Sequence, residues 1–204
     1  MEVSTMTTKV KICGLTIPAD VQIVNDEHPD YAGFVFAPGR HHVNIGQASK
    51  LRALLDPSIV SVGVFVDAPL DTMLSAVDAG AISIVQLHGH EPEAVVELLQ
   101  SRGIPVIRVF QGQQAALPPT AADYVMLDAG AGSGRTLDWR RLTTAPDPLF
   151  LAGGLTPTNV ATAIKAVAPF AVDVSSGVEV RGHKDAALVR DFVRNTRAAM
   201  TQAS

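Results

Sequence analysis

Four side chains able to give up, accept or hold a proton stand where a β-rich run meets a loop: Cys13, His88, Asp128 and Ser175. If these runs are parallel strands of one barrel, their ends open into a common mouth. Cys13 and Asp128 could then face one another across a substrate as a base and an acid. Each also has an ordinary explanation, since a buried cysteine is commonly core and an aspartate closing a strand often caps a turn.

Two glycine-containing segments near the end of the chain are suited to a phosphate. Gly153 and Gly154 follow one β-rich run, and Ser176 and Gly177 follow the next. Backbone amides without side-chain bulk can approach phosphate oxygens, and the loops after strands seven and eight are the usual phosphate site of (β/α)8 barrels. Without a barrel, the same glycines would be explained as well by tight turns.

Arg40 is the candidate for binding a carboxylate. It lies in the loop after the second β-rich run, and its planar, permanently charged fork matches the geometry of a carboxylate. A solvated loop arginine is the commoner outcome at such a position, so the residue type alone leaves both interpretations open.

The histidines offer a possible metal site that we do not favour. His88 and His90 form a His-x-His pair, and His41 and His42 stand side by side in the sequence. No carboxylate lies at ligand spacing beside either pair, and the Glu-Pro dipeptide after His90 is typical of a helix start. We therefore expect no bound metal.

Eight β-rich runs that could position these residues alternate with helical patterns along the chain. The runs span residues 10–13, 32–36, 60–66, 82–87, 106–110, 124–127, 149–152 and 171–174. Apolar residues recur at helical spacing in 45–55, 70–78, 92–101, 157–167 and 185–200. Thr156 is suited to cap a helix that begins at Pro157. The fifth connection contains Pro118 and Pro119 and predicts a short or degenerate helix.

This alternation predicts parallel βαβ units, and the phase of the strands favours a closed barrel over an open sheet. Several runs place polar residues on one face and aliphatic residues on the other, which suits a barrel whose inward side chains line a mouth. The polar-face pairs are Lys11 with Cys13, Gln86 with His88, Arg108 with Phe110, and Asp173 with Ser175. We therefore expect one (β/α)8 TIM barrel over residues 9–204, preceded by a flexible tail over residues 1–8.

The composition narrows the class of function. With 204 residues and 47% hydrophobic side chains, the chain can form one substantial core but is short for two domains. The formal net charge of −4 gives no basic surface for nucleic acid. No apolar run reaches the roughly 18 residues that a membrane span needs. We expect a cytoplasmic protein directed at a small molecule, of undetermined oligomeric state.

Motifs in the same order resemble those of the phosphoribosylanthranilate isomerase family over nearly the whole chain. They are Lys11-Ile12-Cys13-Gly14-Leu15, Gly33-Phe34-Val35-Phe36, Gly63-Val64-Phe65-Val66, Val85-Gln86-Leu87-His88-Gly89, Leu127-Asp128, Leu151-Ala152-Gly153-Gly154-Leu155 and Val172-Asp173-Val174-Ser175-Ser176-Gly177-Val178-Glu179. The resemblance implies a barrel that rearranges an aminoaldose phosphate into an aminoketose phosphate in tryptophan biosynthesis, without a cofactor.

The resemblance also implies roles for individual residues. Cys13 corresponds to the general base and Asp128 to the general acid, and Lys11 could help to lower the pKa of the thiol if it lies close enough. The phosphosugar would be held by the phosphate-binding residues Gly153, Gly154, Ser176 and Gly177 and by the sugar-binding residues Asp173 and His88.

One loop departs from the family pattern. Family members usually have Ser-x-Arg-(Tyr/His)-(Val/Ile) after the second strand, with the arginine on the anthranilate carboxylate, whereas this chain has Pro38-Gly39-Arg40-His41-His42-Val43. Counting back from Val43 places His41 at the arginine position, so Arg40 fills that role only if the loop shifts by one residue. The loop after Asp128 also differs, with Arg135 where lysine is more usual.

Two other functions remain open on the sequence. One is the analogous isomerisation of histidine biosynthesis, although that barrel normally uses two aspartates where this chain has Cys13 and Asp128. The other is a phosphosugar-binding module without turnover, which the presence of both candidate catalytic residues disfavours.

Overall fold

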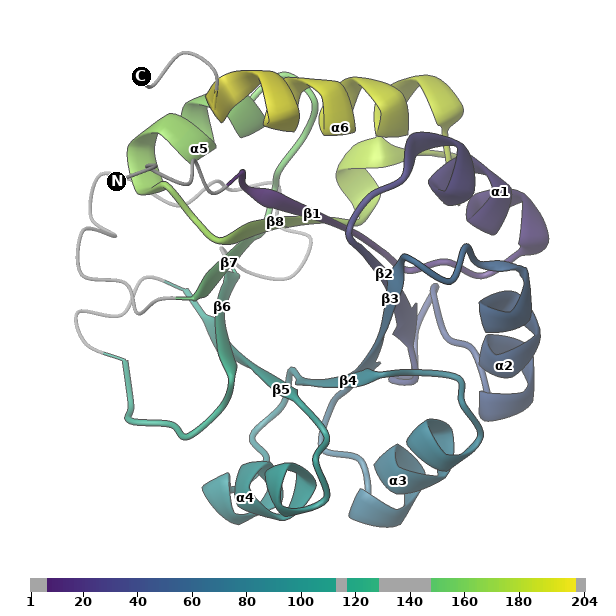
Figure 1. Cartoon of the computed structure of the whole chain (residues 1–204), viewed down its shortest axis with the longest axis vertical. Coiled ribbons are helices and arrows are strands. Elements are labelled where there is room, and N and C mark those ends of the chain that lie inside the picture. Colours follow the sequence, from purple (N-terminus) through teal and green to yellow (C-terminus); the bar gives the residue numbers. More distant parts are fainter. Residues whose placement is uncertain (1–6, 113–116, 129–147, 201–204) are drawn as a thin grey trace.

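The chain forms a closed barrel of eight parallel strands, each hydrogen-bonded to the next in sequence order, with β8 closing onto β1 (Figure 1). The computed structural model describes residues 7–112, 117–128 and 148–200. The strands are β1 (Lys9–Cys13), β2 (Tyr31–Val35), β3 (Val60–Phe65), β4 (Ile84–Leu87), β5 (Val106–Gln111), β6 (Tyr124–Asp128), β7 (Leu149–Ala152) and β8 (Ala171–Val174). The predicted (β/α)8 barrel is thus confirmed.

Helices surround this ring of strands (Figure 1). They are α1 (Pro18–Glu27), α2 (Ile45–Leu54), α3 (Leu70–Asp78), α4 (Glu93–Ser101), α5 (Val160–Val167) and α6 (Ala186–Met200). In the fifth connection the described residues 117–123 contain no helix. The predicted start of a helix at Pro157 is wrong, because Thr156 and Asn159 close a turn first, with the Thr156 amide donating to Asn159 Oδ1, and α5 begins at Val160.

Apolar side chains form two clusters, one inside the barrel and one between the strands and the surrounding helices. The inner cluster contains only residues of strands and of the segment just before β8, and Phe150 in its middle meets Tyr31 and Tyr124 edge-on at ring-centroid distances of 5.4 and 5.5 Å. Tyr31 and Tyr124 begin their strands, so this packing fills the amino end of the barrel. Polar inward side chains consequently lie toward the other end, where the loops that follow the strands form the mouth.

The strand phase was predicted correctly for three of the four polar pairs and wrongly for β5. Ile107 and Val109 pack in the inner cluster, so Arg108 and Phe110 point outward. Arg108 lies 3.8 Å from the buried carboxylate of Glu91, measured from Nη1 to Oε2. Alternation specifies two faces but not which one is inside, and a charge on the outer face is tolerated here because a loop supplies its counterion.

A small hairpin follows β8 and was not predicted. It consists of the 3-10 turn η2 (Ser176–Val178), then β9 (Glu179–Val180) and β10 (His183–Lys184), which pair antiparallel. Arg181 and Gly182 connect the two strands with φ values of +53° and +86°, a left-handed pair that suits a two-residue hairpin turn. The hairpin places Glu179 and Lys184 beside the end of β8.

The described chain begins with an ordered segment ahead of β1. Thr8, which the sequence assigned to the tail, is buried, and its hydroxyl donates to the carbonyl of Pro169 at 3.1 Å. Among the described helices, none has the length and apolar character required to cross a membrane.

Candidate active site

Cys13 and Asp128 are the last residues of their strands, and both face inward at the mouth of the barrel. Cys13 is 7% exposed and Asp128 8% exposed, on β1 and β6. Ser175 follows β8, and His88 follows β4 with its Nε2 atom 3.3 Å from Asp128 Oδ2. The contact of His88 with Asp128 was not foreseen, since the sequence suggested only that His88 lines the pocket. It gives the candidate acid a fixed neighbour that can orient its carboxyl group.

Cys13 occupies a space that only glycine on the neighbouring strand leaves open. Cys13 and Gly33 are register partners of β1 and β2, and a Cβ atom built on Gly33 would lie 2.6 Å from the sulfur. Real Cβ atoms do not approach sulfur so closely, so a side chain at position 33 would displace the thiol. The glycine of the Gly-Phe-Val-Phe motif of the second strand is therefore explained by the position of the candidate base.

A buried ion pair lies two residues before the thiol, on the same face of β1. Lys11 is fully buried, and its Nζ donates to Asp173 Oδ1 at 2.9 Å. Burial acts to lower the pKa of Lys11, but the negative charge of Asp173 and the neighbouring Cys13 outweigh it and raise that pKa, so the ammonium stays charged. Asp173 balances the charge of Lys11 inside the barrel.

The thiol itself does not have the lowered pKa that the sequence interpretation anticipated. Burial raises the pKa of Cys13, and the lowering effects of Lys11 and of Lys184 are too small to reverse this, partly because Asp173 acts in the opposite direction. In the ligand-free protein the thiol is therefore protonated at neutral pH. Lys11 does assist the thiolate, as expected, but against a larger desolvation penalty.

This raised pKa can be measured on the only cysteine of the chain. We expect the rate of alkylation of the folded, ligand-free protein by iodoacetamide to rise with pH, with its midpoint above that of the same protein in denaturant, because the thiolate is the reactive form. Mass spectrometry of timed samples gives the rates. A midpoint in the folded protein at or below the denatured value would contradict the electrostatics described above.

The two glycine-containing loops lie against one another. Gly153 and Gly154 have φ values of +89° and +65°, which side chains rarely tolerate. A Cβ atom built on Gly177 would lie 1.9 Å from the carbonyl oxygen of Leu155, so the loops after β7 and β8 are in direct backbone contact. The loops after β7 and β8 therefore meet at one place at the mouth, and the glycines there permit a backbone conformation and a close approach that other residues would not.

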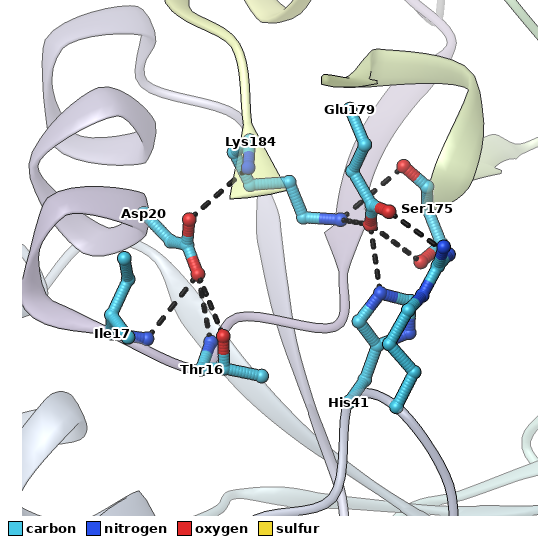
Figure 2. A network of polar contacts seen from close by, with 8 residues as sticks. Thr16, Ile17, Asp20, His41, Ser175, Glu179 and Lys184 are labelled. Carbon is cyan, nitrogen blue, oxygen red and sulfur yellow. Dashed lines mark hydrogen bonds and ion pairs between the residues drawn. The ribbon is translucent and has the colours of Figure 1, made fainter. Parts of the chain in front are cut away.

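Arg40 is engaged with a protein carboxylate. Its Nη2 lies 3.0 Å from Glu179 Oε2, and His41 Nε2 lies 2.9 Å from Glu179 Oε1. The sequence interpretation missed Glu179 as a partner of this loop, although the residue closes the Val-Asp-Val-Ser-Ser-Gly-Val-Glu motif. Figure 2 shows His41, Glu179, Ser175 and Lys184 converging, with dashed lines marking their contacts. The motif and the polar character of residue 179 were the available signals, but the hairpin that places it was not recognised.

The histidine pairs do not converge on a common point. His88 turns toward Asp128, whereas the side chain of His90 is 97% exposed and its backbone amide donates to Asp67 Oδ1. Within the described ranges, no three His, Cys, Asp or Glu side chains are arranged to hold a metal ion. The substituted position Arg135 lies outside the described residues.

A closed (β/α)8 barrel with a thiol, a carboxyl group and two glycine loops at its carboxyl mouth defines a barrel enzyme built for proton transfer on an anionic small molecule. The comparison with known proteins specifies which one. The chain belongs to the family described as N-(5'phosphoribosyl)anthranilate (PRA) isomerase, whose family model matches residues 10–195.

Individual relatives match over more than nine-tenths of both chains. The chain is 48% identical over 188 residues to the N-(5'-phosphoribosyl)anthranilate isomerase of Lacticaseibacillus casei (strain BL23), covering 92% of this chain and 94% of that one. The crystal structure of phosphoribosyl anthranilate isomerase from Thermotoga maritima is similar with a TM-score of 0.83 and 33% identity, covering 94% and 99% of the two chains. A phosphoribosyl anthranilate isomerase in complex with reduced 1-(o-carboxyphenylamino)-1-deoxyribulose 5-phosphate has a TM-score of 0.83 at 32% identity, with coverage of 94% and 99%.

Proposed function

We propose that this chain isomerises N-(5'-phosphoribosyl)anthranilate to 1-(2-carboxyphenylamino)-1-deoxyribulose 5-phosphate by acid-base catalysis, as a step of tryptophan biosynthesis. The observation that carries the proposal is the placement of Cys13 and Asp128 at the mouth of a barrel whose last two loops meet there through glycines. The reaction is an Amadori rearrangement, which moves protons and electrons within one molecule and consumes no second reactant. A working thiol is preserved by a reducing compartment, which supports a cytoplasmic location.

Asp128 is proposed as the general acid of the first step. Its carboxyl group donates a proton to the ring oxygen of the furanose, the bond from C1 to that oxygen breaks, and the nitrogen lone pair forms a protonated Schiff base at C1. His88, 3.3 Å from Asp128 Oδ2, orients the acid toward the ring. The developing negative charge on the leaving oxygen is thereby neutralised as it forms.

Cys13 is proposed as the general base of the second step. The thiolate takes the proton from C2, the electron pair forms the double bond between C1 and C2, and the nitrogen loses its positive charge. The resulting enolamine then relaxes to the ketone. Burial raises the pKa of the Cys13 thiol in the ligand-free protein. The positive Schiff base beside the sulfur favours the thiolate, so the thiol releases its proton to solvent after the acid has acted and can then accept the proton from C2.

The remaining residues bind the two ends of the substrate. The backbone of Gly153, Gly154, Ser176 and Gly177 receives the phosphate, with Gly177 in contact with Leu155 across the two loops. Asp173 keeps acceptor capacity for a sugar hydroxyl beside its bond from Lys11. Arg40, whose side chain is 59% exposed, receives the anthranilate carboxylate, whereas His41 at 16% is turned toward Glu179.

A fluorescence assay tests the proposed function directly. Purified protein added to freshly prepared N-(5'-phosphoribosyl)anthranilate should quench the anthranilate fluorescence in a protein-dependent way, because the product differs from the substrate at the carbon bonded to the nitrogen. Identification of the aminoketose product by mass spectrometry and by its carbonyl reactivity separates isomerisation from hydrolysis to free anthranilate. Folded protein that leaves the fluorescence unchanged would refute the proposal.

A further inference from the structure

Glu179 is the centre of a buried charge cluster that joins two loops of the mouth. Its side chain is only 3% exposed, and it contacts Arg40, His41 and Lys184, the last with Nζ 2.5 Å from Oε1. Burial acts to raise the pKa of Glu179, but the hydrogen bond from Lys184 and the charges of Lys184 and Arg40 outweigh it and lower that pKa. The carboxylate is therefore ionised, and it links the loop after β2 to the hairpin after β8.

The hairpin end of this link is held rigidly. Lys184 Nζ also donates to the Ser175 carbonyl at 3.2 Å, and the Lys184 backbone amide donates to Asp20 Oδ1 at 3.1 Å. Asp20 is itself 1% exposed, and its other oxygen accepts from the Thr16 amide at 2.9 Å and from the Ile17 amide at 3.2 Å. Figure 2 shows this chain of contacts from Ile17 and Thr16 through Asp20 to Lys184 and on to Glu179. Glu179 is thus fixed relative to β1 and β8, which carry Cys13 and Asp173.

In the loop after β2, two side chains contact Glu179, and they differ in charge. Burial lowers the pKa of His41 below its ordinary value despite the opposing effect of Glu179, so His41 is neutral at pH 7 and brings no charge. Arg40 forms an ion pair with Glu179, with Nη2 3.0 Å from Oε2, and its guanidinium has five N–H donors to offer to a further carboxylate. The cluster contains one acidic side chain, Glu179, and two basic ones, of which Arg40 is exposed and Lys184 is buried.

We propose that Glu179 is a positioning residue for substrate binding, which holds Arg40 at the mouth so that the exposed remainder of its fork meets the carboxylate of the substrate. His41 packs as the neutral support of the same loop, over Gly14, where a Cβ would approach its ring to 3.0 Å. This arrangement gives the loop a defined conformation although its sequence departs from the family pattern. The inference rests on the function proposed above, because it requires a substrate that carries both a phosphate and a carboxylate.

The test compares a ligand with a carboxylate and one without it. In Glu179→Gln we expect the KM for N-(5'-phosphoribosyl)anthranilate to rise about tenfold, the scale of one charge-assisted contact, with kcat within about threefold of the wild type. The inhibition constant of ribose 5-phosphate, which has the sugar phosphate but no carboxylate, should stay within about twofold. In Arg40→Ala the KM should rise at least as much, and adding Glu179→Gln to it should raise the KM no further, because both residues act through one contact.

Matched variants keep the outcome interpretable. Glu97→Gln, on the exposed face of α4, is the control for the chemical change and should behave as the wild type. Because Glu179→Gln leaves the buried Lys184 unpaired, the combined variant Glu179→Gln/Lys184→Met removes both charges and should show the same selective rise in KM. An unchanged KM, an equal rise in the ribose 5-phosphate constant, or additive effects of the Arg40 and Glu179 changes would overturn the role of Glu179. Absence of turnover in the wild type would instead refute the proposed function, and this inference with it.

Discussion

Asp128→Asn should lower kcat for N-(5'-phosphoribosyl)anthranilate by at least about a hundredfold, the usual scale for loss of a general acid. Asparagine has the size and shape of the aspartate and can still contact His88, which lies 3.3 Å from Asp128 Oδ2 in the native protein. Its amide cannot transfer a proton to the ring oxygen, so the furanose stays closed and the later steps have no substrate. The initial rate of the fluorescence decrease measures the effect.

A control variant and an inhibition constant separate the loss of the general acid in Asp128→Asn from a general disturbance of the fold. Asp78→Asn, at the exposed end of α3, makes the same chemical change away from the mouth and should retain full activity. The inhibition constant of ribose 5-phosphate should change little in Asp128→Asn, because the phosphate loops after β7 and β8 do not depend on the acid. Turnover near that of the wild type in Asp128→Asn would remove this residue from the mechanism.

Cys13→Ser should also lower kcat by at least about a hundredfold. The smaller oxygen fits the space beside Gly33 that the sulfur occupies, so the barrel has no reason to rearrange. An alcohol gives up its proton far less readily than a thiol, and this position penalises the charged form further, since burial raises the pKa even of the native thiol. The base needed for C2 is then almost absent.

Three measurements separate the loss of the base in Cys13→Ser from unfolding and from loss of ligand binding. Circular dichroism and the thermal unfolding midpoint should match the wild type closely, and ribose 5-phosphate should inhibit with a similar constant. Cys13→Ala should lose as much activity as the serine variant, because neither retains a base. If Cys13→Ser turned over substrate at nearly the native rate, another group would have to take the proton from C2.

The sequence alone was sufficient to predict the barrel, its eight strands and most of its helices, although α1 was not among the helices named. β7 and β8 begin and end where the sequence placed them, and α3 does as well. Such elements are local: the residue alternation of a strand and the apolar spacing of a helix are properties of neighbours in the chain. The candidate base, acid and phosphate loops could be named for the same reason, since each lies at the end of a recognisable strand or directly after it.

The tertiary structure decided how these groups act on one another. Alternation could not say that Arg108 points outward, because that depends on Glu91 arriving from a different loop. Nor could it show that Arg40 is held by Glu179, a contact between residues that are distant in the chain and are brought together by an unrecognised hairpin. The pKa of Cys13 has the same origin, since the opposing effects of burial, Lys11 and Asp173 depend on distances through space. Sequence patterns specify which residues face together along one element, whereas charge interactions depend on the packing of several elements, and only folding sets that packing.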